Sequence, residues 1–208
     1  MPLTHQYLQS PKLHRRGNLS HLTIAMNWND YYMNIAIAVR DKANCLGRKV
    51  GAILVKENRI ISTGYNGTPE GMQNCTDGGC VRCKNREKYK NNIGYDVCIC
   101  VHAEQNAVLS AARFGISIEN SIAYTTMRPC FDCSKALLQA KVKAVYYLHD
   151  WSHPIPELQE QYALIQKQFP KGVKKLKLPD PREEWANLTP PQKLRSLPPA
   201  MKGKSKAT

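Results

Sequence analysis

The pattern of apolar and polar positions in the first part of the chain is first that of a helix and then that of two strands. Residues 28–44, WNDYYMNIAIAVRDKAN, place apolar side chains at helical spacing, which predicts an amphipathic helix. The runs VGAILV (50–55) and RIISTGY (59–65) are rich in β-branched residues, and three polar residues separate them. This pattern predicts two strands joined by a tight turn, a β-hairpin.

Beyond the hairpin, patterns of strands and helices alternate. Residues 65–71, YNGTPEG, carry the Asn-Gly and Pro signals of a loop. The chain then predicts, in order, a helix over 102–113, a strand over 121–127, a helix from Pro129 to about Ala140, a strand over 142–148, a helix over 157–169 and a short strand over 173–178. Strands that alternate with helices indicate an α/β domain with a mixed sheet.

The 208 residues suit one domain with extensions, and the 42% hydrophobic share supports a real core. No run of 18 apolar residues occurs and the first residues do not resemble a signal peptide, so we expect a cytoplasmic protein without a membrane partner. The division that we predict is a poorly structured extension over 1–26, a folded domain over 27–178 and a disordered tail over 179–208.

The formal net charge of +14 is concentrated at the two ends of the chain. Residues 1–26 hold three Lys or Arg and no acid, and residues 171–208 hold ten Lys or Arg against three acids. Such ends could contact nucleic acid or anionic membranes. The Pro- and Lys-rich composition of the tail favours the simpler interpretation, a solubilising disordered segment, so nucleic acid is not the partner that we expect.

Two short motifs carry the chemistry of the chain. His102-Ala103-Glu104 opens one predicted helix, and Pro129-Cys130-Phe131-Asp132-Cys133 opens another. Cysteines three apart on a helix share a face, and a helix N-terminus favours the thiolate that a metal binds. With His102 as a third ligand, water takes the fourth position, which is the pattern of catalytic zinc. Alone, the Cys-x-x-Cys could be a redox pair or half of a structural zinc site.

Glu104 is expected to act beside this metal and not as its ligand. Two residues along a helix amount to a rotation of about 200°, so Glu104 points away from the direction of His102. From there its carboxylate can accept a proton from the attacking water and pass it on as a general acid/base.

Four stretches resemble one enzyme family closely. They are WNDYYMNIA (28–36), VGAILVKENRIISTGYNGTPEG (50–71), VHAEQNAVLSAARFG (101–115) and TTMRPCFDCSKALLQA (125–140). Over residues 27–150, and more loosely to 178, the chain resembles the deoxycytidylate (dCMP) deaminases of the cytidine-deaminase superfamily, in particular their bacterial, phage and competence-operon forms. The resemblance implies a three-layer α/β/α sandwich around a mixed five-stranded sheet. It also implies zinc-dependent hydrolysis of dCMP to dUMP and ammonia, which supplies dUMP for dTMP synthesis.

The resemblance also implies roles for single residues. His102, Cys130 and Cys133 match the ligands of the catalytic zinc, Glu104 matches the proton shuttle, and Asn66 matches a position that contacts the sugar. Gly67 and Arg113 match a region of subunit contacts where dCTP activates and dTTP inhibits many members, with Mg²⁺ accompanying the regulatory triphosphate. Members are commonly hexamers. Arg113 could equally be a solvated helix-end cation, and Arg128 could meet a phosphate or face solvent.

Six further cysteines remain, and in a chain without a secretory signal they favour a metal over disulfides. Cys45 and Cys75 lie where some family members carry ligands of a second, structural zinc. We favour a four-coordinate site of Cys45, Cys75, Cys83 and Cys98, which would order the long loop over residues 72–97. Six candidates compete for four positions, and the alternative is a set of buried free thiols.

Three alternatives to a dCMP deaminase stay open. The chain could act on another cytosine nucleotide, dCTP or CMP, on a base within a nucleic acid, or it could be a zinc-stabilised binding module without activity. The 35 residues between Asn66 and His102 argue against a tRNA editor, which resembles this chain but has a short connection there. Glu104 argues against an inactive module, because a structural zinc site needs no free acid/base.

Overall fold

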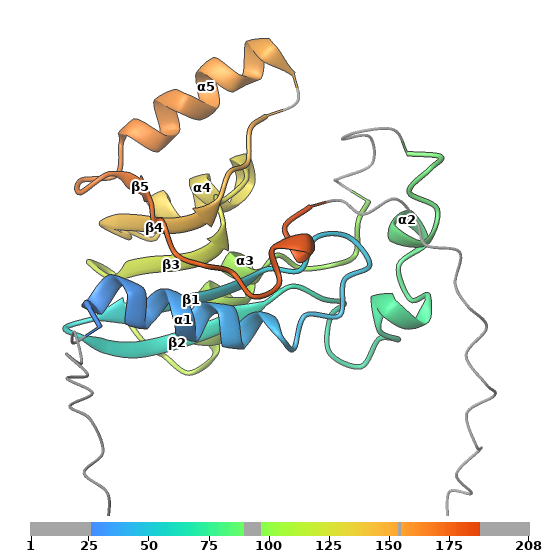
Figure 1. Ribbon diagram of the computed structural model, residues 1–208, viewed down its shortest axis with the longest axis horizontal. Coiled ribbons are helices and arrows are strands. Elements are labelled where there is room, and N and C mark those ends of the chain that lie inside the picture. Colours follow the sequence, from blue (N-terminus) through green and yellow to red (C-terminus); the bar gives the residue numbers. More distant parts are fainter. Residues whose placement is uncertain (1–25, 90–96, 154, 188–208) are drawn as a thin grey trace, which may run out of the picture.

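A five-stranded sheet with helices on both faces forms the centre of the computed structural model, which describes residues 26–89, 97–153 and 155–187 (Figure 1). The sheet order is β2-β1-β3-β4-β5. The strands are β1 Gly51–Lys56, β2 Arg59–Tyr65, β3 Ile122–Met127, β4 Ala144–His149 and β5 Val173–Lys175. The α-helices are α1 Trp28–Arg40, α2 Val81–Lys84, α3 Ala103–Arg113, α4 Phe131–Gln139 and α5 Pro156–Lys167, and the 3₁₀ helices are η1 Cys75–Asp77 and η2 Glu183–Trp185.

The sheet is mixed, as predicted. Strand β1 pairs antiparallel with both β2 and β3, and β3, β4 and β5 run parallel. Glu57 and Asn58 form the two-residue turn between β1 and β2, with φ values of 50° and 58°. Two positive φ values in succession are the mark of the type I′ turn, whose twist matches the twist of a hairpin.

Alternating side chains of the strands bury two separate layers. Ile53 and Val55 of β1 pack against α1, whereas Leu54 faces the other way, in a cluster that includes Ala107 of α3 and Leu137 of α4. Figure 1 shows α1 in front of the sheet, with α3 and α4 on the far side. This is the period-two pattern of a sheet buried on both faces, and it confirms the predicted three-layer arrangement.

Gly64 sets how closely α3 approaches the sheet. A Cβ atom on Gly64 would lie 2.1 Å from the carbonyl oxygen of Ala103 and 2.4 Å from the backbone nitrogen of Ala107. Strand β2 and the first turns of α3 are therefore in backbone contact, which only glycine permits. This contact fixes the height of the N-terminus of α3, where His102 lies.

The structure corrects two predictions about irregular regions. The loop over 72–97 contains η1 and α2, both too short to leave a periodic pattern. The tail was expected from residue 179, but residues 179–187 fold back onto α1. Asp180 forms an ion pair with Arg40, and Lys49 Nζ lies 4.2 Å from the centre of the Trp185 ring. The remaining calls on the ends, 1–25 and 188–208, lie outside the described residues.

Within the described ranges, no helix has both the length and the apolar character needed to cross a membrane.

Candidate active site

The three predicted zinc ligands meet where α3 and α4 begin. His102 is the N-cap of α3 and Cys130 the N-cap of α4, both in extended conformation, and Cys133 lies in the first turn of α4. The His102 backbone N–H donates to Gln105 Oε1 at 3.2 Å, which satisfies one of the donors at the start of α3. Both helix N-termini therefore point at one place and add partial positive charge there.

The distances among these side chains fit a zinc ion. His102 Nδ1 lies 3.4 Å from the Sγ atoms of both Cys130 and Cys133. Tetrahedral zinc with usual bond lengths separates a nitrogen and a sulfur ligand by about 3.6 Å. The group of mutually close donor atoms contains these three residues and not Glu104, so a fourth position is left for water. The donor set is that of a catalytic zinc site.

The three ligands also influence each other's protonation. A hydrogen bond from Cys133 lowers the pKa of Cys130 to about 4, helped by the neighbouring imidazole and opposed by burial. Burial opposes the charge on His102, but the hydrogen bond with Cys130 and the charge of its thiolate raise the pKa of His102 to about 9. Cys130 is thus held as a thiolate, the form that binds metal.

Glu104 lies beside this group in a buried position. Only 5% of the residue is exposed, and its Oε1 atom lies 3.2 Å from Thr125 Oγ1 on β3. Burial raises the pKa of Glu104, and the negative charge of Cys130 raises it further. A carboxyl group with a raised pKa is suited to taking up and releasing a proton near neutral pH.

Helix α5 holds the start of α4 through buried polar contacts that the sequence did not reveal. The Tyr162 hydroxyl donates to the Pro129 carbonyl at 2.7 Å, and Gln166 Nε2 donates to Ser134 Oγ at 2.6 Å. Arg128 Nε donates to Gln166 Oε1 at 3.2 Å. The only sequence signal was the spacing of four between Tyr162 and Gln166, which places both on one face of a helix.

Arg128 is held by protein contacts, which differs from a cation that simply faces solvent. Besides its bond to Gln166, its guanidinium lies 5.4 Å from the ring centre of Tyr147 and 5.2 Å from that of Tyr162. It is half-buried against these rings and does not extend freely into solvent, and a phosphate contact of Arg128 stays a prediction.

Asn66 and Gly67 join the end of β2 to the segments around the site. The Val50 N–H donates to Asn66 Oδ1, and Asn66 Nδ2 donates to the Arg48 carbonyl, both at 2.8 Å. Gly67 pairs with Val101, next to His102, through two backbone hydrogen bonds. A sugar contact of Asn66 stays a prediction, since these bonds show the buried side chain in a structural role.

Arg113 lies at the far end of α3, away from the three ligands. Its Nη1 atom is 3.4 Å from Glu70 Oε2, and both side chains are largely exposed. An exposed pair of this kind contributes little to stability. The pair does connect α3 with the 65–71 loop, the region where regulation was predicted.

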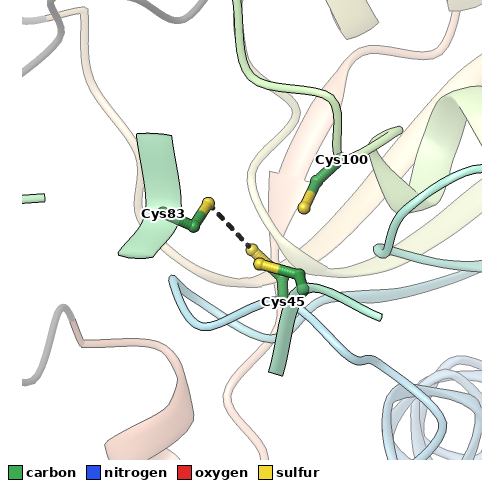
Figure 2. A group of neighbouring side chains, drawn as sticks. Cys45, Cys83 and Cys100 are labelled. Atoms are coloured by element: carbon green, nitrogen blue, oxygen red, sulfur yellow. Dashed lines mark hydrogen bonds between the residues drawn. The ribbon is translucent and has the colours of Figure 1, made fainter. Parts of the chain in front are cut away.

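The other six cysteines form one cluster beside the sheet, and its grouping corrects the predicted ligand set. Cys45, Cys75, Cys83 and Cys100 bring their sulfurs within 4.8 Å of one another, and so do Cys80, Cys83, Cys98 and Cys100. Figure 2 shows the side chains of Cys45, Cys83 and Cys100 pointing toward one another from three segments. The predicted set of four ligands matches neither group, because Cys100, and not Cys98, lies with Cys45, Cys75 and Cys83. Residues two apart in a non-helical segment can face the same way, which the sequence could not settle for Cys98 and Cys100.

The chain is similar to deoxycytidylate deaminases in sequence and in structure. A deoxycytidylate deaminase of Schizosaccharomyces pombe is 40% identical over 136 residues, 65% of this chain and 41% of that protein. ComE operon protein 2 of Bacillus subtilis is 34% identical over 146 residues, 69% of this chain and 71% of that protein. The dCMP deaminase of cyanophage S-TIM5, solved in complex with dCMP and dUMP, is 34% identical with a TM-score of 0.55, over 70% of this chain and 94% of that one.

The chain thus spans about two fifths of the length of the yeast relative. Residues 26–149 match the family model of the cytidine and deoxycytidylate deaminase zinc-binding region. These findings confirm the resemblance that the motifs indicated, and with it the cytidine-deaminase-like fold. Since the matched region covers more than half of the chain, this protein belongs to the cytidine and deoxycytidylate deaminase family.

Proposed function

We propose that this protein hydrolyses dCMP to dUMP and ammonia with a zinc ion at the His102, Cys130 and Cys133 site. The observation that carries the proposal is the buried carboxyl group of Glu104 next to three metal ligands that leave one position open. A purely structural zinc site has four protein ligands and no use for a neighbouring proton carrier.

The residues of the site divide the work between holding and moving charge. When bound, zinc supplies Lewis-acid activation of a water molecule at neutral pH. Glu104 takes the proton released by the attacking water and delivers it to the ring nitrogen next to the reacting carbon. The oxygen of the water bonds to that carbon, and Glu104 then takes the remaining proton of the added hydroxyl group and passes it to the amino group. The amine leaves as ammonia as its bond to the ring carbon breaks and the carbonyl forms. Thr125 orients the Glu104 carboxyl group for these transfers.

The choice of dCMP as substrate rests on the relatives. The similar proteins of S. pombe and of cyanophage S-TIM5 carry the name deoxycytidylate or dCMP deaminase, and the latter was solved with dCMP and dUMP. In this chain we propose that Asn66, or its backbone neighbours, contributes to the pocket for the sugar.

We further propose that the enzyme is cytoplasmic and forms a homo-oligomer, a hexamer. In this proposal dCTP and dTTP regulate its activity, and Mg²⁺ binds together with the triphosphate. Support comes from the continuity between the 65–71 loop and the active site. Gly67 is bonded to Val101, one residue before His102, and Arg113 reaches the same loop through Glu70. A triphosphate bound near Gly67 and Arg113 could therefore act on the position of His102.

One comparison of substrates tests the reaction. Purified zinc-loaded protein is incubated with dCMP, CMP, dCTP, deoxycytidine and a cytosine-containing single strand, and loss of the amine is followed by ultraviolet absorbance. We expect turnover to be fastest with dCMP. Preferential turnover of another member of the set would overturn the substrate assignment, and turnover of none would overturn the proposed function. Titrating dCTP and dTTP into the same assay tests regulation.

A further inference from the structure

The six cysteines outside the active site form two overlapping groups of four. The first contains Cys45, Cys75, Cys83 and Cys100, and the second contains Cys80, Cys83, Cys98 and Cys100. Cys83 and Cys100 belong to both groups, while each of the other four belongs to one. From this overlap we infer that the cluster binds two zinc ions, with Cys83 and Cys100 as thiolates that bridge them.

The distances between the sulfurs match zinc–thiolate geometry. In tetrahedral zinc with Zn–S bonds of about 2.3 Å, neighbouring sulfurs lie about 3.8 Å apart. The Cys45 and Cys83 sulfurs are 3.9 Å apart, as the dashed line in Figure 2 marks, in the first group. In the second group Cys98 lies 3.7 Å from Cys83 and 3.8 Å from Cys80. Disulfide sulfurs would lie about 2.05 Å apart, and all six cysteines are free thiols.

The number of ligands requires that sulfurs be shared. Two tetrahedral zinc ions need eight ligand positions, and six cysteines supply them only if two of the sulfurs bridge. A single zinc ion in the first group would leave Cys80, which has 0% exposure, and Cys98 without a metal although both sulfurs are in contact distance of others. An iron–sulfur cluster takes four cysteines and places sulfide between them, so it would use neither all six sulfurs nor their direct contacts.

The surroundings suit a closed structural site. Five of the six cysteines are buried, and among the residues that the structure describes no histidine or carboxylate joins either group of four. The backbone N–H of Leu46 donates to Cys75 Sγ, and that of Gly47 donates to Cys45 Sγ, both at 3.3 Å. Such bonds stabilise thiolates.

The charge of the cluster is also matched by its surroundings. Two Zn²⁺ ions and six thiolates leave a net charge of −2, and bridging avoids the greater excess of two separate four-thiolate sites. Arg86 Nη1 lies 3.9 Å and Cys45 Sγ 3.3 Å from the Cβ position of Gly47, so a guanidinium group approaches the first group of sulfurs. A cationic side chain near a sulfur favours its deprotonated form.

The cluster would join four segments of the chain to the active site. Cys45 follows α1, Cys75 begins η1, Cys80 is the N-cap of α2 and Cys83 lies within it, and Cys98 and Cys100 precede α3. Cys100 is two residues from His102, and Val101 between them is bonded to Gly67. The bridging sulfur of Cys100 therefore fixes the segment that delivers His102 to its own zinc.

The metal content of the purified protein tests the number of ions. We expect three zinc ions per chain by elemental analysis, and two in a Cys133→Ala variant that lacks an active-site ligand. Two ions in the wild type would reduce the cluster to a single site, and one would remove it; stoichiometric iron with visible absorption would replace zinc by an iron–sulfur cluster. Each of these results overturns the inference. The inference of two cluster zinc ions does not depend on the proposed reaction, because the cluster can bind both ions in a protein that fails to turn over dCMP.

A second experiment tests whether Cys83 and Cys100 bridge the two metal ions, independently of how many ions bind. In protein loaded with cadmium-113, we expect two tetrathiolate resonances that are coupled to each other through the shared sulfurs, and two uncoupled resonances would contradict bridging. We also expect Cys83→Ser, at a bridging position, to lose two zinc ions. Cys75→Ser, at a non-bridging position, should retain at least one zinc ion more than Cys83→Ser does. Equal losses of zinc in the two variants would contradict the assignment of Cys83 as a bridge. Should Cys83→Ser not fold, the cadmium spectrum of the wild type still decides.

Discussion

Thr125 Oγ1 lies 3.2 Å from Glu104 Oε1 and 3.0 Å from the carbonyl oxygen of Met127. A hydroxyl group donates one hydrogen bond and can accept others. Thr125 can therefore donate to Glu104 when that carboxyl group is ionised. When Glu104 is protonated, it can donate to Thr125, which then donates to Met127. The contact holds Glu104 in place in both states that a proton carrier must adopt.

We predict that Glu104→Gln strongly lowers the rate of turnover and leaves zinc bound. The amide keeps the shape of the side chain but cannot accept the proton of the attacking water, and loss of a general acid/base typically lowers the rate by about 10²- to 10⁴-fold. Steady-state kinetics with dCMP and elemental analysis measure the two quantities. Loss of active-site zinc in this variant would mean that Glu104 is a ligand. Substantial activity would mean that another group moves the proton.

Thr125→Val should lower kcat by roughly 10- to 100-fold, the range expected when one hydrogen bond to a charged group is lost. The isosteric valine keeps the packing of β3 but cannot orient Glu104. Thr125→Ser is the matched control, since it retains the hydroxyl group. If Thr125 acts only by positioning Glu104, KM for dCMP stays nearly unchanged and the serine variant recovers most of the rate. Equal losses in the two variants would indicate a packing defect instead.

The strands and helices could be predicted because their patterns are local. The β-branched runs of β1 and β2, and the motifs that begin at His102 and Pro129, each depend on neighbours within a few residues. The shared role of Cys83 and Cys100 depends on how four distant segments meet, and no spacing in the sequence encodes that. The choice between Cys98 and Cys100 turned on the direction of two side chains in an irregular segment.

Residues 179–187 were missed for a related reason. Their Pro- and charge-rich composition is typical of a disordered tail, and only the position of their partners shows otherwise. Arg40, on α1, is fully buried and forms two hydrogen bonds with the carboxylate of Asp180, at 2.7 and 2.6 Å. His149 Nε2 lies 2.6 Å from the same carboxylate. A buried arginine needs such a partner, but the burial of Arg40 is visible only in the structure.

Asp180→Asn is expected to lower the free energy of unfolding by about 3–5 kcal/mol at pH 7, as for other buried pairs that lose one charge. Burial favours the protonated form of Asp180, but the hydrogen bonds from Arg40, the backbone N–H of Arg182 and His149 together outweigh it and lower the pKa of Asp180. A depressed folded-state pKa gives stability that is present above the unfolded-state pKa of about 3.9 and is lost as the pH falls further.

Denaturant unfolding at several pH values checks this prediction. The difference between wild type and Asp180→Asn should be constant from pH 7 to about pH 5 and should shrink below about pH 4. Lys175→Gln is a control, because the Lys175–Asp150 pair is exposed and should contribute little to stability. A difference for Asp180→Asn as small as that of the control would show that residues 179–187 do not hold α1.

Gly64→Ala should displace the N-terminus of α3 and weaken the binding of active-site zinc. The added Cβ would meet the carbonyl oxygen of Ala103 at 2.1 Å and the nitrogen of Ala107 at 2.4 Å, both backbone atoms that cannot rotate away. Overpacking of this kind costs about 1–3 kcal/mol or more of stability. Because α3 carries both His102 and Glu104, its shift separates them from the two cysteines on α4.

A chelator competition and an activity assay together measure this effect. We expect Gly64→Ala to lose its active-site zinc at a lower chelator concentration than the wild type, with a matching fall in kcat. Gly71→Ala is the matched control: Gly71 has a φ of 83° and nothing within 4 Å of its Cβ position, so the variant bears backbone strain without a clash. Strain alone should lower stability and leave zinc retention unchanged. Equal zinc loss in the two variants would show that the contact between β2 and α3 does not position His102.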